Sequence, residues 1–236
     1  MKMKKVICAA LALLALAVFA GGAALRYAGY EASAAALAQM AEGETDGNVT
    51  AFVPEAARAG LIFYPGGLVD HAAYAPLMRM LASRGVLCLL VQMPMDLAVL
   101  DADAAQGLQQ RYPGVERWLI GGHSLGGAMA ADYAAKHPEE FDGVLLLGAY
   151  SAAELSGTDL SVLSVYGSQD GVLSREKYEA CRRNYPAGFE EFVIEGGCHA
   201  YFGDYGFQKG DGTPSVSREM QMGMTASAVS AWIDRL

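Results

Sequence analysis

The sequence has few basic residues for its length, with 17 Lys and Arg against 26 Asp and Glu in 236 residues and a net charge of −9. Four of the positive charges, Lys2, Lys4, Lys5 and Arg26, lie in or beside the N-terminal segment, which contains no acidic residue. Removing these four charges leaves −13 for the rest of the chain. An acidic body without a basic stripe argues against nucleic-acid binding. It also argues against electrostatic docking of the body on anionic lipid.

Cysteine is also scarce, with four residues at positions 8, 88, 181 and 198. Their spacing fits no zinc or redox motif, so we expect neither a metal site nor a redox centre. Cys181 and Cys198 can pair only if the fold brings them together in the narrow geometry that a disulfide needs. We therefore expect free thiols, most of them buried.

The N-terminus carries the one long apolar run. Residues 1–5 are basic, and residues 6–25 are uncharged and rich in alanine and leucine. A membrane-spanning helix needs about 20 apolar residues, so residues 1–26 are predicted to form a signal anchor, with the lysines cytoplasmic and the body outside. The alternative is a signal peptide cleaved before Gly21, which would release a secreted protein. The apolar run continues to Leu25, which favours the anchor.

The remaining chain divides into a linker at residues 27–48 and one domain at residues 49–236. Within the linker, residues 27–40 are alanine-rich and predicted helical, and residues 41–48 read as a polar turn. The domain alternates apolar strands with helices. Strands are predicted at residues 49–53, 60–64, 86–92, 117–121, 144–147, 161–166 and 190–194. Helices are predicted at residues 72–83, 101–112, 125–137, 174–184 and 217–236.

Several of these strands are nearly continuous apolar runs, as at residues 86–91. Burial on both faces is what parallel strands between two layers of helices require. The alternation therefore predicts an α/β fold with a doubly wound, mostly parallel sheet. Functional sites in such sheets form at the carboxyl ends of the strands.

A candidate nucleophile lies at one such strand end. Residues 122–126 read Gly-His-Ser-Leu-Gly, between an apolar strand and a helix of small residues. The tight turn forces Ser124 into a strained backbone conformation, and the flanking glycines avoid clashes with neighbouring chain segments. The N–H of Leu125 opens the helix, where the unpaired donors and the dipole favour an oxyanion.

A serine hydroxyl needs a base, and the base needs an acid that orients it. Of the four histidines, His199 is the candidate base because it follows the last strand in a glycine-rich loop. Asp170 is the candidate acid because it follows a strand end and a glycine turn, with a helix after it. The order Ser124, Asp170, His199 is the one that this kind of elbow predicts. Asp96, which follows an earlier strand, is the rival acid.

The second oxyanion donor is predicted in the loop Tyr-Pro-Gly-Gly-Leu at residues 64–68. Its glycines permit close approach of the backbone to a substrate, and either Gly67 or Leu68 would donate. Four residues are candidates for lining the substrate pocket: Gly66, His71, Asp96 and Tyr201. Tyr201 belongs to an aromatic, glycine-rich segment at residues 200–212. That segment is predicted either to form an acyl-binding wall or to pack the last helix onto the sheet.

These motifs, in this order, resemble those of the α/β-hydrolase superfamily over about residues 49–236. The resemblance is closest to the compact, lidless group of esterase-like and dienelactone-hydrolase-like members. Dienelactone hydrolases use a cysteine nucleophile, whereas this chain has Ser124. The connection at residues 148–160 is too short for the cap domain that many members carry, so an open site is expected.

The resemblance implies a serine hydrolase that cleaves carboxylic esters through an acyl-enzyme, with a small-molecule acyl substrate and no cofactor. Thioester cleavage, amide cleavage or acyl transfer by the same triad are alternatives. A catalytically silent binding module on the same fold is a further alternative, against which an intact triad argues.

Overall fold

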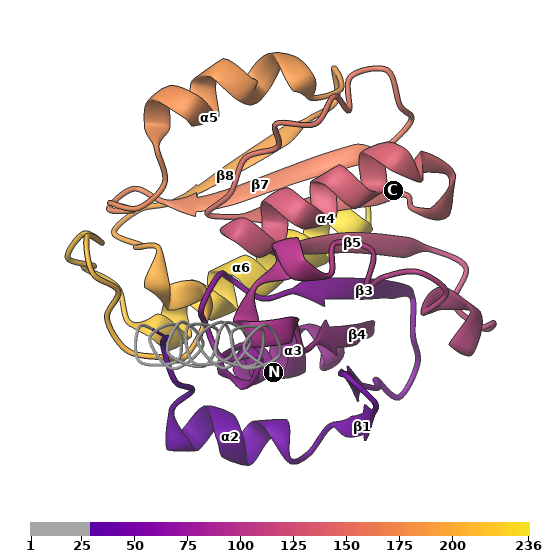
Figure 1. The fold of residues 1–236 in the computed structure, drawn as a ribbon, viewed down its shortest axis with the longest axis horizontal. Helices are drawn as coiled ribbons and strands as arrows, with labels where there is room; N and C mark the ends of the chain where they lie inside the picture. The colour runs from indigo at the N-terminus through magenta and orange to yellow at the C-terminus, as the bar shows by residue number, and fades with distance from the viewer. Residues whose placement is uncertain (1–28) are drawn as a thin grey trace, which may run out of the picture.

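The computed structural model describes residues 29–236, which form one eight-stranded sheet flanked by helices (Figure 1). The strand order is β1-β2-β4-β3-β5-β6-β7-β8. Strands β1, β2 and β4 pair antiparallel, and every pairing from β4 through β8 is parallel. The strands are β1 (Glu44–Asp46), β2 (Val49–Phe52), β3 (Ala59–Tyr64), β4 (Val86–Val91), β5 (Trp118–His123), β6 (Gly143–Leu147), β7 (Ser161–Gly167) and β8 (Glu190–Ile194).

Helices cover both faces of this sheet. The α-helices are α2 (Ala34–Met40), α3 (Ala75–Ala82), α4 (Leu125–Lys136), α5 (Arg175–Cys181) and α6 (Arg218–Ile233). Short 3-10 turns are η1 (His71–Tyr74), η2 (Pro94–Asp96), η3 (Ala98–Leu100), η4 (Gln109–Arg111), η5 (Pro138–Glu140), η6 (Arg182–Asn184) and η7 (Ala200–Phe202). In Figure 1, α4 and α6 lie on opposite sides of the central strands. In agreement, the two helices pack into two separate hydrophobic cores, one on each face of the sheet.

The central strands supply side chains to both cores in alternation. Leu61 and Phe63 of β3 pack with α3 and α6, whereas Ile62 and Tyr64 pack with α4. Every residue of β4 is likewise buried. Full burial of a large apolar side chain contributes about 1.5–3 kcal/mol. The predicted doubly wound, mostly parallel α/β sheet is thereby confirmed, and the strands lie within two residues of their expected positions.

The connection between β6 and β7 is short and holds no helix, so no sizeable cap domain lies there. The helix expected at residues 101–112 is wrong, because this stretch is a series of turns that ends in η4. Tertiary hydrogen bonds replace the helical ones. The Ala105 N–H donates to Tyr64 Oη at 2.8 Å, and that hydroxyl donates to the Ala102 carbonyl at 3.0 Å. Gly107, at φ +74°, also departs from helical geometry.

Residues 29–48, expected as a linker, pack onto the domain instead. Helix α2 begins only at Ala34, after the N-cap Ser33, whose backbone N–H donates to the Asp204 carbonyl at 2.8 Å. Tyr30 forms a parallel bridge with Val69. The expected polar turn contains β1, which pairs with β2 through a turn at Gly47 with φ +63°.

The predicted anchor and the alternative cleavage point lie outside the described residues. Within residues 29–236, no helix is long and apolar enough to cross a membrane. The three cysteines of this part, Cys88, Cys181 and Cys198, are free thiols, so Cys181 and Cys198 are not paired.

Candidate active site

Ser124 occupies a sharp corner between β5 and α4. Its backbone has φ 52° and ψ −121°, a strained conformation for a residue with a side chain. A Cβ on Gly122 would lie 2.4 Å from the Tyr64 carbonyl oxygen, and one on Gly126 would lie 2.2 Å from the Pro65 carbonyl oxygen. Only glycines therefore allow the loop after β3 to lie so close to the corner. The Ser124 residue itself is partly exposed.

Asp170 and His199 form a buried pair at the ends of β7 and β8. His199 Nδ1 donates to Asp170 Oδ2 at 2.8 Å, and the side chains are 1% and 0% exposed. The other carboxylate oxygen, Oδ1, accepts from the N–H groups of Val172 and Leu173 at 2.9 and 2.8 Å. These two bonds fix the carboxylate so that Oδ2 faces the imidazole. His199 Nε2 is buried and has no hydrogen-bond partner within residues 29–236.

The loop after β6 joins this pair to Ser124. The Ser124 N–H donates to the Leu147 carbonyl at 2.9 Å, which holds the corner against the end of β6. Gly148 directly follows Leu147, and a Cβ on it would lie 3.0 Å from His199 Nδ1 and 3.2 Å from Asp170 Oδ2. The three predicted triad residues therefore gather at one edge of the sheet. No hydrogen bond joins the Ser124 hydroxyl to His199 among the described residues.

The backbone around β3 distinguishes the two alternative oxyanion donors. The Leu68 N–H donates to the Asp96 carbonyl at 2.7 Å and is thus occupied. Within residues 29–236, the N–H groups of Gly67 and Leu125 have no hydrogen-bond acceptor. A Cβ on Gly67 would lie 3.0 Å from Leu125 Cδ2, so the two residues are adjacent. This geometry favours Gly67 over Leu68.

The hydrogen bond to His199 distinguishes the two candidate acids. Asp170, not Asp96, bonds to Nδ1 of His199. The Asp96 backbone instead braces the loop of Leu68. Both residues have positive φ, 55° and 59°. Asp96 thus lies beside the candidate oxyanion loop, where the sequence places a pocket residue, and not at the base.

Two buried side chains that the sequence did not single out support the site. The Gly66 N–H donates to Tyr74 Oη at 3.0 Å, and Tyr74 Oη lies 2.7 Å from His123 Nδ1. The hydroxyl thus accepts from the Gly66 N–H and shares a second hydrogen bond with Nδ1, in which the tautomer of His123 sets the donor. The His123 ring centroid lies 4.4 Å from that of His199.

These groups are neutral for physical reasons. Burial lowers the pKa of His123 well below its ordinary value, and the neighbouring His199 lowers it further. Burial raises the pKa of Tyr74. Gly66, Tyr74 and His123 therefore form an uncharged hydrogen-bonded chain that runs from the oxyanion loop to the imidazole beside His199. Tyr74 lies in an alanine-rich stretch and carries no sequence signal of this role.

Helix α6 holds the loop that carries His199. Gln221, which is fully buried, accepts from the Cys198 N–H at 2.9 Å and donates to the Cys198 carbonyl at 2.7 Å. This paired contact fixes the residue directly before His199. The aromatic segment that follows is also packed, with Phe202 and Tyr205 in the core between the sheet and α6.

The remaining pocket candidates make local contacts. The guanidinium of Arg218 in α6 lies 4.7 Å from the centre of the Tyr201 ring, which favours the packing interpretation of this segment. His71 Nδ1 lies 3.2 Å from Asp70 Oδ1 at the start of η1. Gly66 is required by its neighbours, since a Cβ there would lie 2.8 Å from both His123 Nδ1 and Tyr74 Oη.

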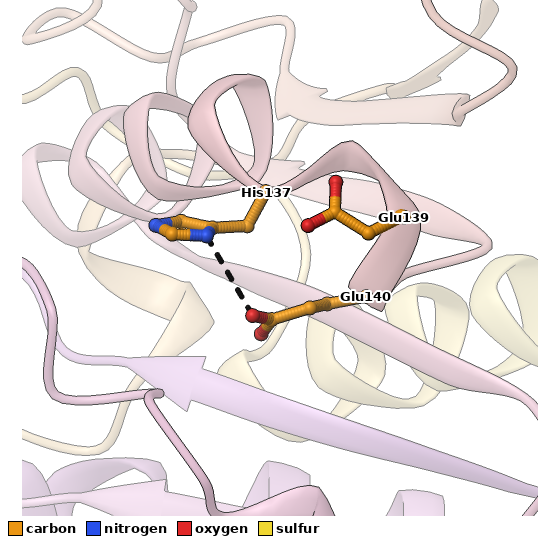
Figure 2. Close-up of side chains that lie close together, drawn as sticks. All are labelled: His137, Glu139 and Glu140. Atoms are coloured by element: carbon orange, nitrogen blue, oxygen red, sulfur yellow. Dashed lines mark ion pairs between the residues drawn. The ribbon is translucent and has the colours of Figure 1, made fainter.

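One group of potential metal ligands lies elsewhere. Within residues 29–236, His137, Glu139 and Glu140 place one ligand atom each within 4.8 Å of one another. Figure 2 shows these side chains where α4 ends and η5 begins, with His137 Nδ1 paired to Glu140 at 3.6 Å. The 12 residues of α4, at 1.5 Å each, separate this group from Ser124 by about 18 Å. It cannot act on a group bound at Ser124.

The fold matches those of known hydrolases. The esterase domain of a Rhodothermus marinus protein superposes with a TM-score of 0.59 at 14% identity, covering 79% of this chain and 92% of that chain. A dienelactone hydrolase from Anabaena variabilis gives 0.60 at 17% identity, covering 79% and 90%. Est1E from Butyrivibrio proteoclasticus gives 0.57 at 16% identity, covering 82% and 96%. At these identities the likeness establishes the fold.

Sequence comparison is more specific about the family. No curated protein sequence matches the chain significantly. The profile of the Alpha/beta hydrolase family, however, matches residues 60–223, which include the elbow, the acid loop and the base. Because this match spans more than half of the chain, the protein belongs to the alpha/beta hydrolase family.

Proposed function

We propose that this hydrolase cleaves carboxylic esters through a Ser-His-Asp triad and an acyl-enzyme. The observation that carries the proposal is the 2.8 Å hydrogen bond between His199 and Asp170, beside a serine held at positive φ. Buried Asp170 fixes the tautomer of His199 and balances the charge that develops on the imidazole. The free Nε2 is then the atom that takes a proton.

In the first half-reaction, Ser124 Oγ bonds to the ester carbonyl carbon while His199 Nε2 accepts the hydroxyl proton. The carbonyl oxygen becomes an oxyanion, which accepts from the N–H groups of Leu125 and Gly67. The intermediate then breaks its bond to the alkoxy oxygen, and the imidazolium passes its proton to the departing alcohol.

The second half-reaction mirrors the first. A water molecule bonds to the acyl carbon while His199 Nε2 takes a proton from it. The Ser124 ester bond then breaks, and the proton returns from His199 to Ser124 Oγ. The carboxylic acid leaves, and the triad is restored. These steps use only groups of this chain, the ester and water.

The experiment that tests this proposal follows hydrolysis of p-nitrophenyl acetate by the wild type and by Ser124→Ala. Turnover should fall roughly 10⁴–10⁶-fold, as in other triads that lose the nucleophile. A fluorophosphonate probe should label Ser124 in the native protein and leave the variant unlabelled. Ser156→Ala, on the exposed loop after β6, is the control and should keep full activity. Wild-type turnover by Ser124→Ala would refute the triad.

The same assay defines the acyl class. Esters should be cleaved faster than matched thioesters and amides, and hydrolysis should exceed transfer of the acyl group to an added alcohol. A reversed order would assign the triad to thioester or amide cleavage or to acyl transfer. The absence of both turnover and labelling in folded protein would favour a binding module.

We further propose that residues 1–26 anchor the enzyme in a membrane, with the catalytic domain outside the cytoplasm. The basic residues 1–5 followed by the uncharged residues 6–25 support this arrangement. Secretion after cleavage before Gly21 is the alternative.

A further inference from the structure

Asp211 lies outside the proposed triad, yet its carboxylate accepts hydrogen bonds from the backbone of both the loop of Asp170 and the loop of His199. Oδ1 accepts from the N–H groups of His199 at 3.0 Å, Gly171 at 3.1 Å and Gly212 at 2.8 Å. Oδ2 accepts from the Ala200 N–H at 2.8 Å. One side chain therefore collects four backbone donors.

Three of these donors, Gly171, His199 and Ala200, belong to the two loops that carry the acid and the base. Gly171 directly follows Asp170, and Ala200 directly follows His199. The hydrogen bond between His199 and Asp170 spans the gap between the same two loops. Asp211 is thus a second link across that gap, made through the backbone.

The segment around Asp211 fits closely against the acid loop. A Cβ on Gly171 would lie 2.5 Å from the Gly210 carbonyl oxygen, and one on Gly212 would lie 1.9 Å from the Gln169 carbonyl oxygen. Only glycines permit this contact. A backbone packed this tightly has little freedom to shift, so the carboxylate is held at a fixed place between the loops.

The charge of Asp211 suits this position. Burial acts to raise its pKa, but the four backbone N–H groups outweigh burial, and the pKa is lowered overall. Burial and the neighbouring Asp211 raise the pKa of the Cys198 thiol to about 12, so the thiol stays neutral. The ionised carboxylate therefore keeps all four hydrogen bonds at neutral pH.

We infer that Asp211 is a positioning residue that locks the acid loop to the base loop and so holds His199 in line with Asp170. This inference rests on the proposed triad. Sequence spacing gave no sign of it, because Asp211 lies in the aromatic, glycine-rich segment expected to form an acyl-binding wall or to pack the last helix.

The test compares wild type, Asp211→Asn and Asp211→Ala. Asn keeps one acceptor oxygen and Ala keeps none, so turnover of p-nitrophenyl acetate should fall with Asn and fall further with Ala. A misplacement of about 1 Å costs roughly 10²-fold in rate, and the loss should appear in kcat, with KM little changed. Fluorophosphonate labelling should slow in parallel.

A second readout needs no substrate. The proton between His199 Nδ1 and Asp170 Oδ2 should give a downfield proton resonance, which should broaden or move in Asp211→Asn. Asp204→Asn is the matched control, because Asp204 lies in the same segment but bonds to Ser33 and Arg218 and to no triad residue. It should lower thermal stability while leaving the resonance and kcat intact.

The outcomes separate the two proposals. An active wild type with unchanged kcat and resonance in both Asp211 variants would overturn the positioning role and leave the esterase proposal standing. An inactive, unlabelled wild type would overturn the esterase proposal. In that case the resonance still decides whether Asp211 holds His199 against Asp170.

Discussion

At the scale of single residues, the hydroxyl of Tyr74 stabilises the loop after β3 and the buried ring of His123. It bonds to the oxyanion loop at Gly66 and to His123, and it is fully buried. Tyr74→Phe would leave a buried N–H and a buried ring nitrogen unpaired. Each such loss costs about 1–3 kcal/mol, so the free energy of unfolding should fall by at least about 1 kcal/mol.

Urea unfolding measures that change, and hydrolysis of p-nitrophenyl acetate measures its effect on the site. We expect kcat/KM to fall as well, since the loop that bears Gly67 loses a contact. Tyr112→Phe is the control, because the Tyr112 hydroxyl makes no hydrogen bond within residues 29–236. Equal stability of the two variants would show that the Tyr74 hydroxyl contributes nothing.

His123 makes stability depend on pH. The pKa of His123 is lowered in the folded protein but has its ordinary value, near 6.5, in the unfolded chain. At a pH between these two pKa values, the unfolded chain therefore binds more protons than the folded protein does. The contribution of His123 to stability is therefore complete above about pH 6.5 and is lost as pH falls below it, with a slope of at most about 1.4 kcal/mol per pH unit.

Unfolding free energies from pH 5 to 8 test this expectation. Asn at position 123 places an amide, with a donor and an acceptor, near the position of Nδ1 and does not titrate, so His123→Asn should show a shallower loss of stability toward acid pH. Identical slopes for the wild type and this variant would mean that folding does not lower the pKa of His123.

Gly148 leaves room for the acid–base pair. Gly148→Ala would put a Cβ 3.0 Å from His199 Nδ1 and would strain a backbone at φ +51°. Displacement of the imidazole should lower kcat for p-nitrophenyl acetate by roughly tenfold or more. Gly107→Ala shares the positive φ but meets no atom within 4 Å, so it should lose stability and keep kcat. Similar kcat losses in both variants would assign the effect to strain alone.

Some residues of the site can be predicted from the sequence, and others cannot. Ser124, Asp170 and His199 could be picked out because each lies in a glycine-flanked turn after a predicted strand, in a definite chain order. Tyr74 and His123 are 49 residues apart, and Asp211 and Gly171 are 40 apart. Contacts over such separations depend on how the loops pack, which no local pattern encodes. The choice between Gly67 and Leu68 similarly required the Asp96 contact.

At the scale of elements, the hydrophobic pattern predicted the buried strands well, but it failed at residues 101–112 and at β1. Strands buried on both faces have a distinctive apolar run, as β4 shows. Residues 101–112 have the composition of a helix, but hydrogen bonds to Tyr64 hold them in turns. Strand β1 is short, polar and exposed, so its pairing with β2 left no apolar signal.

Ser33 links helix α2 to the rest of the domain. Its hydroxyl accepts from the Ala36 N–H at 3.0 Å and donates to Asp204 Oδ2 at 2.5 Å. Ser33→Ala should lower stability by about 0.5–2 kcal/mol, the usual cost of losing an N-cap. Hydrogen exchange should quicken in α2 and stay unchanged in α4. Ser227→Ala, at an exposed position in α6, is the control. Unchanged protection of α2 would show that its packing on α3 suffices.

At the scale of the whole molecule, charge and hydropathy are separated along the chain. The N-terminal segment is basic and apolar, and the body is acidic. The full chain should therefore fractionate with membranes and resist alkaline extraction. Two Leu→Arg changes at residues 13 and 14 should release it, since arginine at the centre of a span costs about 2.5–3.5 kcal/mol.

The N-terminal residue of the purified protein distinguishes the anchor from a cleaved signal. An anchored protein should keep residues 1–20, whereas a mature chain beginning at Gly21 would establish cleavage and secretion. A soluble protein that retains residues 1–20 would contradict both proposals.

The strand order has a consequence for how the molecule assembles. Strand β4 pairs between β2 and β3, and from β5 onward the sheet grows in one direction through β6, β7 and β8, so each of these strands joins an edge that already exists. A chain emerging from its N-terminus can therefore add these last four strands in the order of synthesis. Ser124 is then in place early, while His199 arrives only with β8, and Gln221 of α6 fixes its loop last. A chain released before its last helix would therefore carry the nucleophile without a fixed base.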